Sequence, residues 1–309
     1  MLKKVIIFVW FITLLITLNQ FPKRALDNEI PNFDDFDILY YQPGSGSLAI
    51  NLYNIETGQT QTLETDLIKP VLSTDHHFLI GLGGGNTISG GYPQLIDLNR
   101  NLFYYCPAGY YNQNYQIDPR TNDPKQFILT TSSTVYLYNF NDCETVEVFI
   151  DIRNYKQVLK EPFGIEGAHL SADGETLYFG YRNWKNEKLF LYEFTLHSGV
   201  LNRISDGINP VLSHNQQQIV FGKKDGLYLL DLESLTEEKI VDIDPTDKIY
   251  PTVPHWSADD SKLVFHTFSG RNTTDNLDFK DCLQIYVYDI KSKTLNELPV
   301  KGMDPSWIP

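Results

Sequence analysis

The chain has 309 residues, and its 39 acidic against 25 basic side chains give a formal net charge of -14 at pH 7. Such a surface repels polyanions, whereas nucleic-acid binding depends largely on Lys and Arg neutralising phosphates, so binding to DNA or RNA is disfavoured. Aromatic side chains make up 13% of the residues, which favours strands, and a single large all-β domain can reach this length.

Residues 1–25 have the layout of a targeting segment. Two lysines precede an apolar run over residues 5–18, as in a secretory signal peptide. The run is shorter than the ~20 residues that a membrane span needs, yet no small-residue cleavage site follows it, so a signal anchor formed by residues 5–21 is the alternative. No Cys follows the run, which argues against a lipoprotein. We expect an exported protein, periplasmic or extracellular, with residues 26–32 as a linker.

Four segments further along the chain repeat one pattern, in which a short strand leads through Ser and a polar turn into an apolar strand. They are "KPVLSTDHHFLIG" (69–81), "GAHLSADGETLYF" (167–179), "NPVLSHNQQQIVF" (209–221) and "VPHWSADDSKLVF" (253–265). A second marker, an alternating apolar strand with a polar end, recurs at Asn54, Asp97, Asn139, Glu193, Asp231 and Asp289, on average 47 residues apart. A period of this size in an all-β chain indicates propeller blades of four strands each.

The end of the chain restarts the repeated pattern. In "GMDPSWIP", Pro305 and Trp307 stand where Pro254 and Trp256 stand in the last full repeat, whereas the first blade lacks this segment. We therefore expect the C-terminal strand to pair into the first blade and close the ring, which removes a free sheet edge. The prediction is an all-β, six-bladed β-propeller over residues 33–309, with Trp256 in the core between two blades.

The segments "PHWSADD" and "IYVYDI" resemble the Pro-x-Trp-Ser-x-Asp-Gly and Ile-Tyr-Val-x-Asp pattern of the TolB-like propellers, a family of WD40-like repeats. The resemblance covers nearly the whole chain after residue 30, and it implies an exported protein whose six blades form a ring. "SHNQQ" and "STDHH" depart from the motif, and blade three has lost its inner-strand signature. The family's separate N-terminal domain has no counterpart here, which argues against a role in the Tol envelope complex.

The three cysteines, Cys106, Cys143 and Cys282, allow at most one disulfide, and their spacing matches no metal motif. We expect them to be separate, small apolar residues. The Gly-rich stretch over residues 81–91 is followed by a strand that Pro93 opens, whereas a phosphate-binding loop needs a helix there. It is therefore expected to connect the second and third strands of blade two.

Two histidines occupy the same place in the repeat. His169 and His255 precede the inner-strand residues Leu170 and Trp256, and the inner strands line the channel. Propeller polysaccharide lyases of the same superfamily, which the chain resembles loosely, hold a divalent metal on channel histidines. Because Val71, Val211 and Ser306 fill the equivalent places, a third ligand would have to come from elsewhere. We expect no cofactor, with a divalent metal on His169 and His255 as the alternative. His76, His77 and His214 fall in turns between first and second strands, which places them on the face opposite the long connections.

The long connections all fall on one face, because antiparallel strands place second-to-third and blade-to-blade connections together. Long loops persist more often where they bind something, and Tyr offers rigid amphipathic contact area. The predicted binding residues are Tyr110, Tyr111, Tyr115, Asp244, Asp247, Arg271 and Asp278.

Three hypotheses for the function follow. The first is a noncatalytic propeller that binds a protein or glycan partner through this face. The alternatives are a metal-dependent polysaccharide lyase or hydrolase, and a scaffold for a membrane-anchored assembly. No Gly-x-Ser-x-Gly elbow of a serine hydrolase occurs in the sequence.

Overall fold

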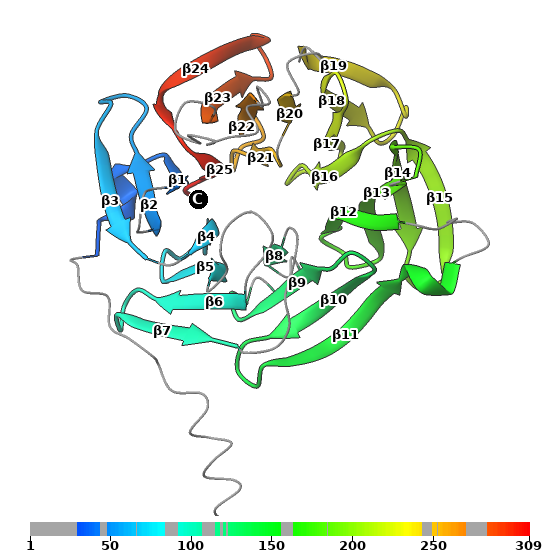
Figure 1. The fold of residues 1–309 in the computed structure, drawn as a ribbon, viewed down its shortest axis with the longest axis horizontal. Helices are drawn as coiled ribbons and strands as arrows, with labels where there is room; N and C mark the ends of the chain where they lie inside the picture. Colours follow the sequence, from blue (N-terminus) through cyan, green and yellow to red (C-terminus); the bar gives the residue numbers. More distant parts are fainter. Residues whose placement is uncertain are drawn as a thin grey trace, which may run out of the picture.

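The strands form a ring of six blades around a central channel (Figure 1). The computed structural model describes residues 30–43, 48–65, 67–83, 92–106, 115–117, 120–121, 123–155, 163–183, 185–242, 249–251, 253–269 and 283–309. Over these ranges the strands make six antiparallel sheets, so the predicted six-bladed β-propeller is confirmed. Within the same ranges, no helix has the length and hydropathy needed to cross a membrane.

Each blade is a sheet whose first strand lies at the channel and whose last strand lies at the rim (Figure 1). Blade one consists of β25 (Met303–Trp307), β1 (Ile38–Pro43), β2 (Leu48–Tyr53) and β3 (Thr60–Glu64). Blade two consists of β4 (Ile68–Leu72), β5 (Phe78–Gly83), β6 (Tyr92–Asp97) and β7 (Leu102–Tyr105). Blade three consists of β8 (Tyr115–Ile117), β9 (Gln126–Thr130), β10 (Thr134–Asn139) and β11 (Glu144–Asp151). Blade four consists of β12 (Phe163–Leu170), β13 (Thr176–Asn183), β14 (Lys188–Thr195) and β15 (Val200–Ser205). Blade five consists of β16 (Ile208–Leu212), β17 (Gln218–Lys223), β18 (Gly226–Asp231) and β19 (Glu237–Asp242). In blade six, β20 (Ile249–Pro251) and β21 (His255–Trp256) both pair with β22 (Lys262–Ser269), which is followed by β23 (Leu283–Asp289) and β24 (Thr294–Lys301). Two short 3-10 helices, η1 (Phe33–Asp35) and η2 (Ile152–Tyr155), precede blade one and follow blade three.

The position of a strand in its blade explains its sequence. Middle strands such as β17 are packed by neighbouring blades on both faces, so their central residues are all buried and read as continuous apolar runs. Outer strands such as β24 are mostly exposed and carry polar side chains. The apolar runs therefore mark the middle strands of each blade.

The C-terminal strand closes the ring as predicted. β25 pairs antiparallel with β1, with Ile38 opposite Trp307 and Leu39 opposite Ser306. The first blade thus takes its inner strand from the end of the chain, and the closure pairs the edge of β1 that would otherwise be free.

In blades two, four, five and six, the turn after the inner strand is held by a Ser and by an Asp or Asn two residues later. In blade six, the Ser257 hydroxyl donates to Asp259 and accepts from the backbone N–H of Lys262. Hydrogen bonds from Ser257 and Ser261 lower the pKa of Asp259 to about 2. The residue after this Asp, or after Asn215 in blade five, has a left-handed backbone, with φ of 57° at His76, 75° at Gly174, 63° at Gln216 and 55° at Asp260. Glycine is the residue that adopts this conformation without steric cost, which explains the Gly of the motif.

Trp256 lies in the core between blades five and six, as predicted. Its side chain is 5% exposed and packs in a cluster with Val220 of β17 and with Leu263 and Phe265 of β22. The indole N–H donates to the carbonyl oxygen of Val211 at 3.0 Å. The residue therefore joins two blades by packing and by a hydrogen bond.

The expectation that the cysteines are separate is wrong. Cys106, just after β7 of blade two, forms a disulfide with Cys143, in the turn between β10 and β11 of blade three. The two are 37 residues apart in sequence, and only the packing of blade two on blade three brings them together. Cys282 lies outside the described residues.

Two other details differ from the sequence interpretation or complete it. In blade four, Thr195 rather than Glu193 takes the place of Asp231 and Asp289, because it pairs with the first residue of the second strand. The inner strand of blade three, which lacks the repeated signature, is the three-residue β8. The residues between β5 and β6 connect the second and third strands of blade two, as expected.

Candidate functional site: the central channel

The channel contains a cavity of about 510 Å³. Its wall is formed by inner-strand residues of all six blades and by the turns that follow them, including Ser73, Ala172 and His214. Apolar side chains make up most of the lining, and the volume is within the range of small-ligand sites. The cavity therefore reaches the tight-turn side of the ring, opposite the long connections.

One residue of each inner strand stands at the same level of the wall, fixed by its pairing with the second strand. These residues are Val71, Gln116, His169, Val211, His255 and Ser306. His169 and His255 both line the cavity, and the equivalence expected from the repeat is confirmed. Gln116 is the third large polar side chain at this level.

Polar groups in the wall bind the backbone of adjacent blades. The Trp307 indole N–H donates to the carbonyl oxygen of His255 at 3.0 Å, as Trp256 does to Val211. The Gln116 amide accepts from the backbone N–H of Leu170 at 2.9 Å. These interblade hydrogen bonds occupy main-chain groups at the channel, so they stabilise the ring.

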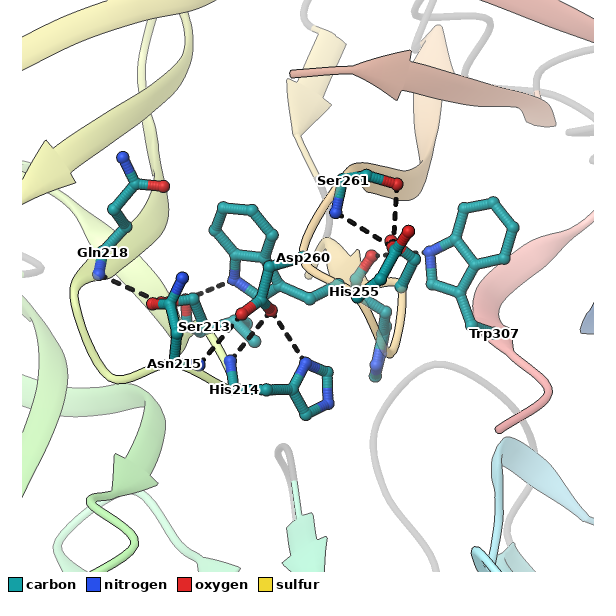
Figure 2. A network of polar contacts seen from close by, with 12 residues as sticks. Ser213, His214, Asn215, Gln218, His255, Asp260, Ser261 and Trp307 are labelled. Carbon is teal, nitrogen blue, oxygen red and sulfur yellow. Dashed lines mark hydrogen bonds and ion pairs between the residues drawn. The ribbon is translucent and has the colours of Figure 1, made fainter. Parts of the chain in front are cut away.

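The tight turns are linked in the same way (Figure 2). The Asp260 carboxylate of blade six accepts from the backbone N–H groups of His214 and Asn215 in blade five, both at 2.9 Å, and lies 2.8 Å from Nδ1 of His214. Gln216 of blade five accepts from the backbone N–H of Ala172 in blade four at 2.9 Å. Both acceptors stand at the left-handed position of their turns.

The departures from the Gly of the motif therefore have a structural role. A left-handed backbone costs an L-residue about 1–2 kcal/mol. Asp260 and Gln216 offset this cost with side-chain bonds to the preceding blade, and the imidazole Nε2 of His76 lies 2.9 Å from the backbone oxygen of Pro309 in blade one.

Burial keeps the channel imidazoles neutral. Burial, and then the neighbouring His214 and His255, lower the pKa of His169 to about 3. Burial lowers the pKa of His255 to about 4, against an opposing effect of Asp304. At pH 7 both rings are uncharged, and Nδ1 of His169 is buried without a hydrogen-bond partner.

Within the described ranges, the channel histidines have no third ligand for a metal ion. Neutral imidazoles are the form that binds a metal, but no group of three or more His, Cys, Asp or Glu side chains within the described ranges is placed to hold an ion. His214 was expected only in a tight turn, and it stands there. It also lines the cavity, although its Nδ1 is directed at Asp260. A divalent metal on His169 and His255 gains no support from this arrangement.

The predicted binding residues fall almost entirely outside the described part of the chain. Tyr110, Tyr111, Asp244, Asp247, Arg271 and Asp278 all lie there. Only the backbone of Tyr115 is described, and its expected place in a long connection is wrong, because it belongs to the inner strand β8. The residues 118–125 that follow β8 therefore connect first and second strands, on the tight-turn side. The binding role of all seven stays a prediction.

Sequence reasoning missed several residues of the cavity wall. Lys69 and Asp304 line it from equivalent positions just before a proline, each with a left-handed backbone (φ 52° and 46°), and the strand register shifts there. A bulge of this kind turns the inner strand and redirects the side chain. Aligning all six inner strands in the sequence could have found these residues, but the lost signature of blade three would still have hidden Gln116.

Fold and site together define a TolB-like six-bladed propeller with a mainly apolar channel cavity. No protein-family model matches the sequence, and no curated protein matches it. Among solved structures, a putative TolB from Agrobacterium tumefaciens is similar at 18% identity with a TM-score of 0.61, over 85% of this chain and 94% of that one. TolB from Acinetobacter baumannii is similar at 13% identity with a TM-score of 0.64, over 91% and 68%. An oligogalacturonate lyase in complex with manganese is similar at 13% identity with a TM-score of 0.50, over 89% and 74%. Identities this low establish the fold alone.

Proposed function

We propose that this protein is a noncatalytic, exported propeller that binds a protein or glycan partner through its long-connection face. The observation that carries the proposal is the use of polar groups in the channel. The side chains of Trp256, Trp307 and Gln116 form hydrogen bonds with the backbone of neighbouring blades. The imidazole of His214 pairs with the carboxylate of Asp260 in blade six. These side chains therefore hold the ring together. The TolB-like fold supports a noncatalytic propeller in the same sense.

The strand order supports the choice of face. The connections 84–91, 107–114, 243–248 and 270–282 follow second or fourth strands, which end on the same side of an antiparallel blade. The turns on the other side, such as 213–217, are short and tied by internal hydrogen bonds. On the tight-turn side, 118–125 of blade three is the exception in length. Several long connections gathered on one side are typical of a binding face.

The disulfide supports export. Disulfides persist in oxidising compartments and are rare in the cytosol, and Cys106–Cys143 joins two blades of this ring. The apolar run in residues 5–21 remains either a cleaved signal or a membrane anchor. Cell fractionation with N-terminal sequencing of the mature protein distinguishes the two.

The binding proposal is tested with purified residues 26–309. Neutral and acidic oligosaccharides are titrated by calorimetry, and envelope proteins are captured by crosslinking in cells. The variant Tyr110→Ala/Tyr111→Ala/Arg271→Ala should weaken any binding at least tenfold with little change in Tm. The matched control His77→Ala/Glu175→Ala/Gln217→Ala alters three exposed residues of the tight-turn face and should bind normally.

Two results would count against the proposal. Binding lost only in the tight-turn control would move the partner to the channel mouth. Stoichiometric bound Mn²⁺ or another divalent metal, together with cleavage of an acidic oligosaccharide that His169→Ala or His255→Ala abolishes, would favour the metal-dependent lyase instead.

A further inference from the structure

Two opposite charges stand at one end of the channel cavity. Lys69 of blade two and Asp304 of blade one are both partly buried in its wall. Their inner strands, β4 and β25, belong to adjacent blades, and the Ser306 hydroxyl of β25 donates to the carbonyl oxygen of Pro70 in β4 at 2.9 Å. The left-handed bulge at each charged residue lies near the start of its strand. The two charges therefore stand on neighbouring strands, at the end of the cavity farther from the tight turns.

Both charges act on one buried imidazole, that of His266 in β22. Its Nδ1 accepts a hydrogen bond from the backbone N–H of Asp304 at 3.0 Å. Burial lowers the pKa of His266 to about 4; the carboxylate of Asp304 opposes this shift, and the ammonium of Lys69 adds to it. Such an effect requires a charge close to the ring. The two side chains are therefore close to the same imidazole and hence to each other.

Neither charge has an ion-pair partner among the residues that the structure describes. Burial raises the pKa of Glu166 in blade four against the effects of Arg182 and Lys69, and Glu166 is already paired with Arg182 at 2.8 Å. A partly buried charge without a partner has lost solvation, and a ligand of opposite charge offsets that loss. Lys69 and Asp304 are therefore placed to hold a molecule that carries both a carboxylate and an ammonium.

The cavity wall between these charges and the tight turns is mainly apolar. Inner-strand side chains such as Val71 and Val211 form it. The imidazoles of His169 and His255 stand at the same level, and both are uncharged at pH 7 because burial lowers their pKa values. In pockets of this kind the apolar wall contacts the body of a ligand, and the few polar groups fix its orientation. Charge recognition is therefore confined to one end of the cavity.

We propose that the channel cavity binds a small zwitterion with an apolar body, of the class of α-amino acids with a large apolar side chain. The ligand's carboxylate pairs with Lys69, its ammonium pairs with Asp304, and its side chain extends between Val71 and Val211 toward the tight turns. An α-amino acid carries both charges on one carbon, so it satisfies both protein groups at the same end. A fatty acid or an alkylamine leaves one of the two protein charges unpaired.

The first test compares ligands that differ by one charge. Calorimetric titration of the purified protein with L-phenylalanine should give one site with a Kd below about 1 mM. 3-Phenylpropionate lacks the ammonium and 2-phenylethylamine lacks the carboxylate, so each should bind at least tenfold more weakly. The dipeptide Phe-Phe separates its two charges along the chain and should also bind at least tenfold more weakly.

The second test removes one protein charge at a time. In blade five, Asn209 holds the equivalent left-handed position before a proline, with φ 53°, so Asn is tolerated there. Lys69→Asn and Asp304→Asn should each weaken L-phenylalanine binding at least tenfold. Lys69→Asn should leave the affinity for 2-phenylethylamine within twofold, and Asp304→Asn that for 3-phenylpropionate. The matched control Lys291→Asn removes an exposed charge outside the cavity and should bind like the wild type.

Three results would overturn the proposal: no saturable binding of L-phenylalanine or L-leucine, equal affinity for the single-charge analogues, or unchanged binding in both Asn variants. Tightest binding of Phe-Phe would replace the amino acid by a peptide and also count against it. If a variant does not fold, the comparison of ligands on the wild type still decides. Neither variant alters the long-connection face, so this site can fail while the proposed partner binding holds, and the reverse.

Discussion

The indole of Trp256 offers a direct test of how the blades are joined. It is 5% exposed, it packs on residues of both β17 and β22, and its N–H donates to Val211. Replacing a buried Trp by Ala costs about 3–5 kcal/mol from lost packing and the cavity left behind. Trp256→Phe keeps an aromatic ring but leaves the Val211 carbonyl without this donor, at a cost of about 1–3 kcal/mol.

These losses convert to measurable shifts. Large domains lose roughly 2–4 °C of Tm for each kcal/mol of destabilisation, so Trp256→Ala should lower Tm by roughly 6–20 °C and Trp256→Phe by roughly 2–12 °C. Thermal melts followed by circular dichroism, with urea titrations to obtain the free energy of unfolding, measure both. Leu295→Ala, which truncates a side chain 46% exposed on β24, is the control and should shift Tm by less than 1–2 °C. If Trp256→Ala behaved like Leu295→Ala, the indole would not be an interblade core residue and the packing argument would fail.

Three further predictions follow from the closure, the turns and the channel. Deleting residues 302–309 removes the strand that pairs with β1, so the truncated protein should aggregate or lose cooperative unfolding, and a monomer with unchanged Tm would contradict closure by β25. Asp260→Gly relieves the left-handed backbone but removes the bonds to His214 and Asn215; we expect a net loss of about 1 kcal/mol in urea titrations, whereas a gain would mean that the backbone strain outweighs the link. The pKa of His169 is about 3 and those of His255 and His266 are about 4, all lowered mainly by burial, against about 6.5 in the unfolded chain. Below pH 6.5 the unfolded chain binds more protons, so stability should fall as the pH drops from 7 to 5, by on the order of 1–2 kcal/mol per imidazole. His169→Gln and His255→Gln should each flatten this profile, and an equally steep profile in both variants would place the pH dependence elsewhere.

The repeat in the sequence was sufficient to predict the blades. Apolar runs such as "KLVFHTF" mark strands buried on both faces, and "SADD" marks a turn whose Ser and Asp bond its own backbone, so both are local signals. The restart of the pattern at Pro305 and Trp307 predicted the closure because the first blade lacked that strand. Most long connections could be assigned to one face because antiparallel pairing decides on which side they leave. The exception is 118–125, because β8 before it carries no recognisable signature.

The functional site depended far more on tertiary contacts. Gln116 has no recognisable motif around it, and it joins the wall only because β8 pairs with β9 at the matching register. His214 belongs to a turn by its sequence, yet the packing of blade five on blade four brings that turn beside His169. The sequence contains no signal for either placement, because each depends on how one blade packs against the next.

What the sequence determined by itself is the number of blades, the strands within them and the segment that closes the ring, since these follow from hydrophobic periodicity, turn chemistry and repetition along the chain. What only the tertiary structure decided is what the blades bring together: the Cys106–Cys143 bond, the side chains of Asp260 and Gln216 that reach the preceding blade, and the cavity whose wall draws one strand from each of six blades. The physical reason is the distance along the chain over which each kind of interaction acts. Periodicity and turns are set by residues a few positions apart, whereas contacts between blades join residues about 40 positions apart or more, and these exist only once the blades have packed into a closed ring.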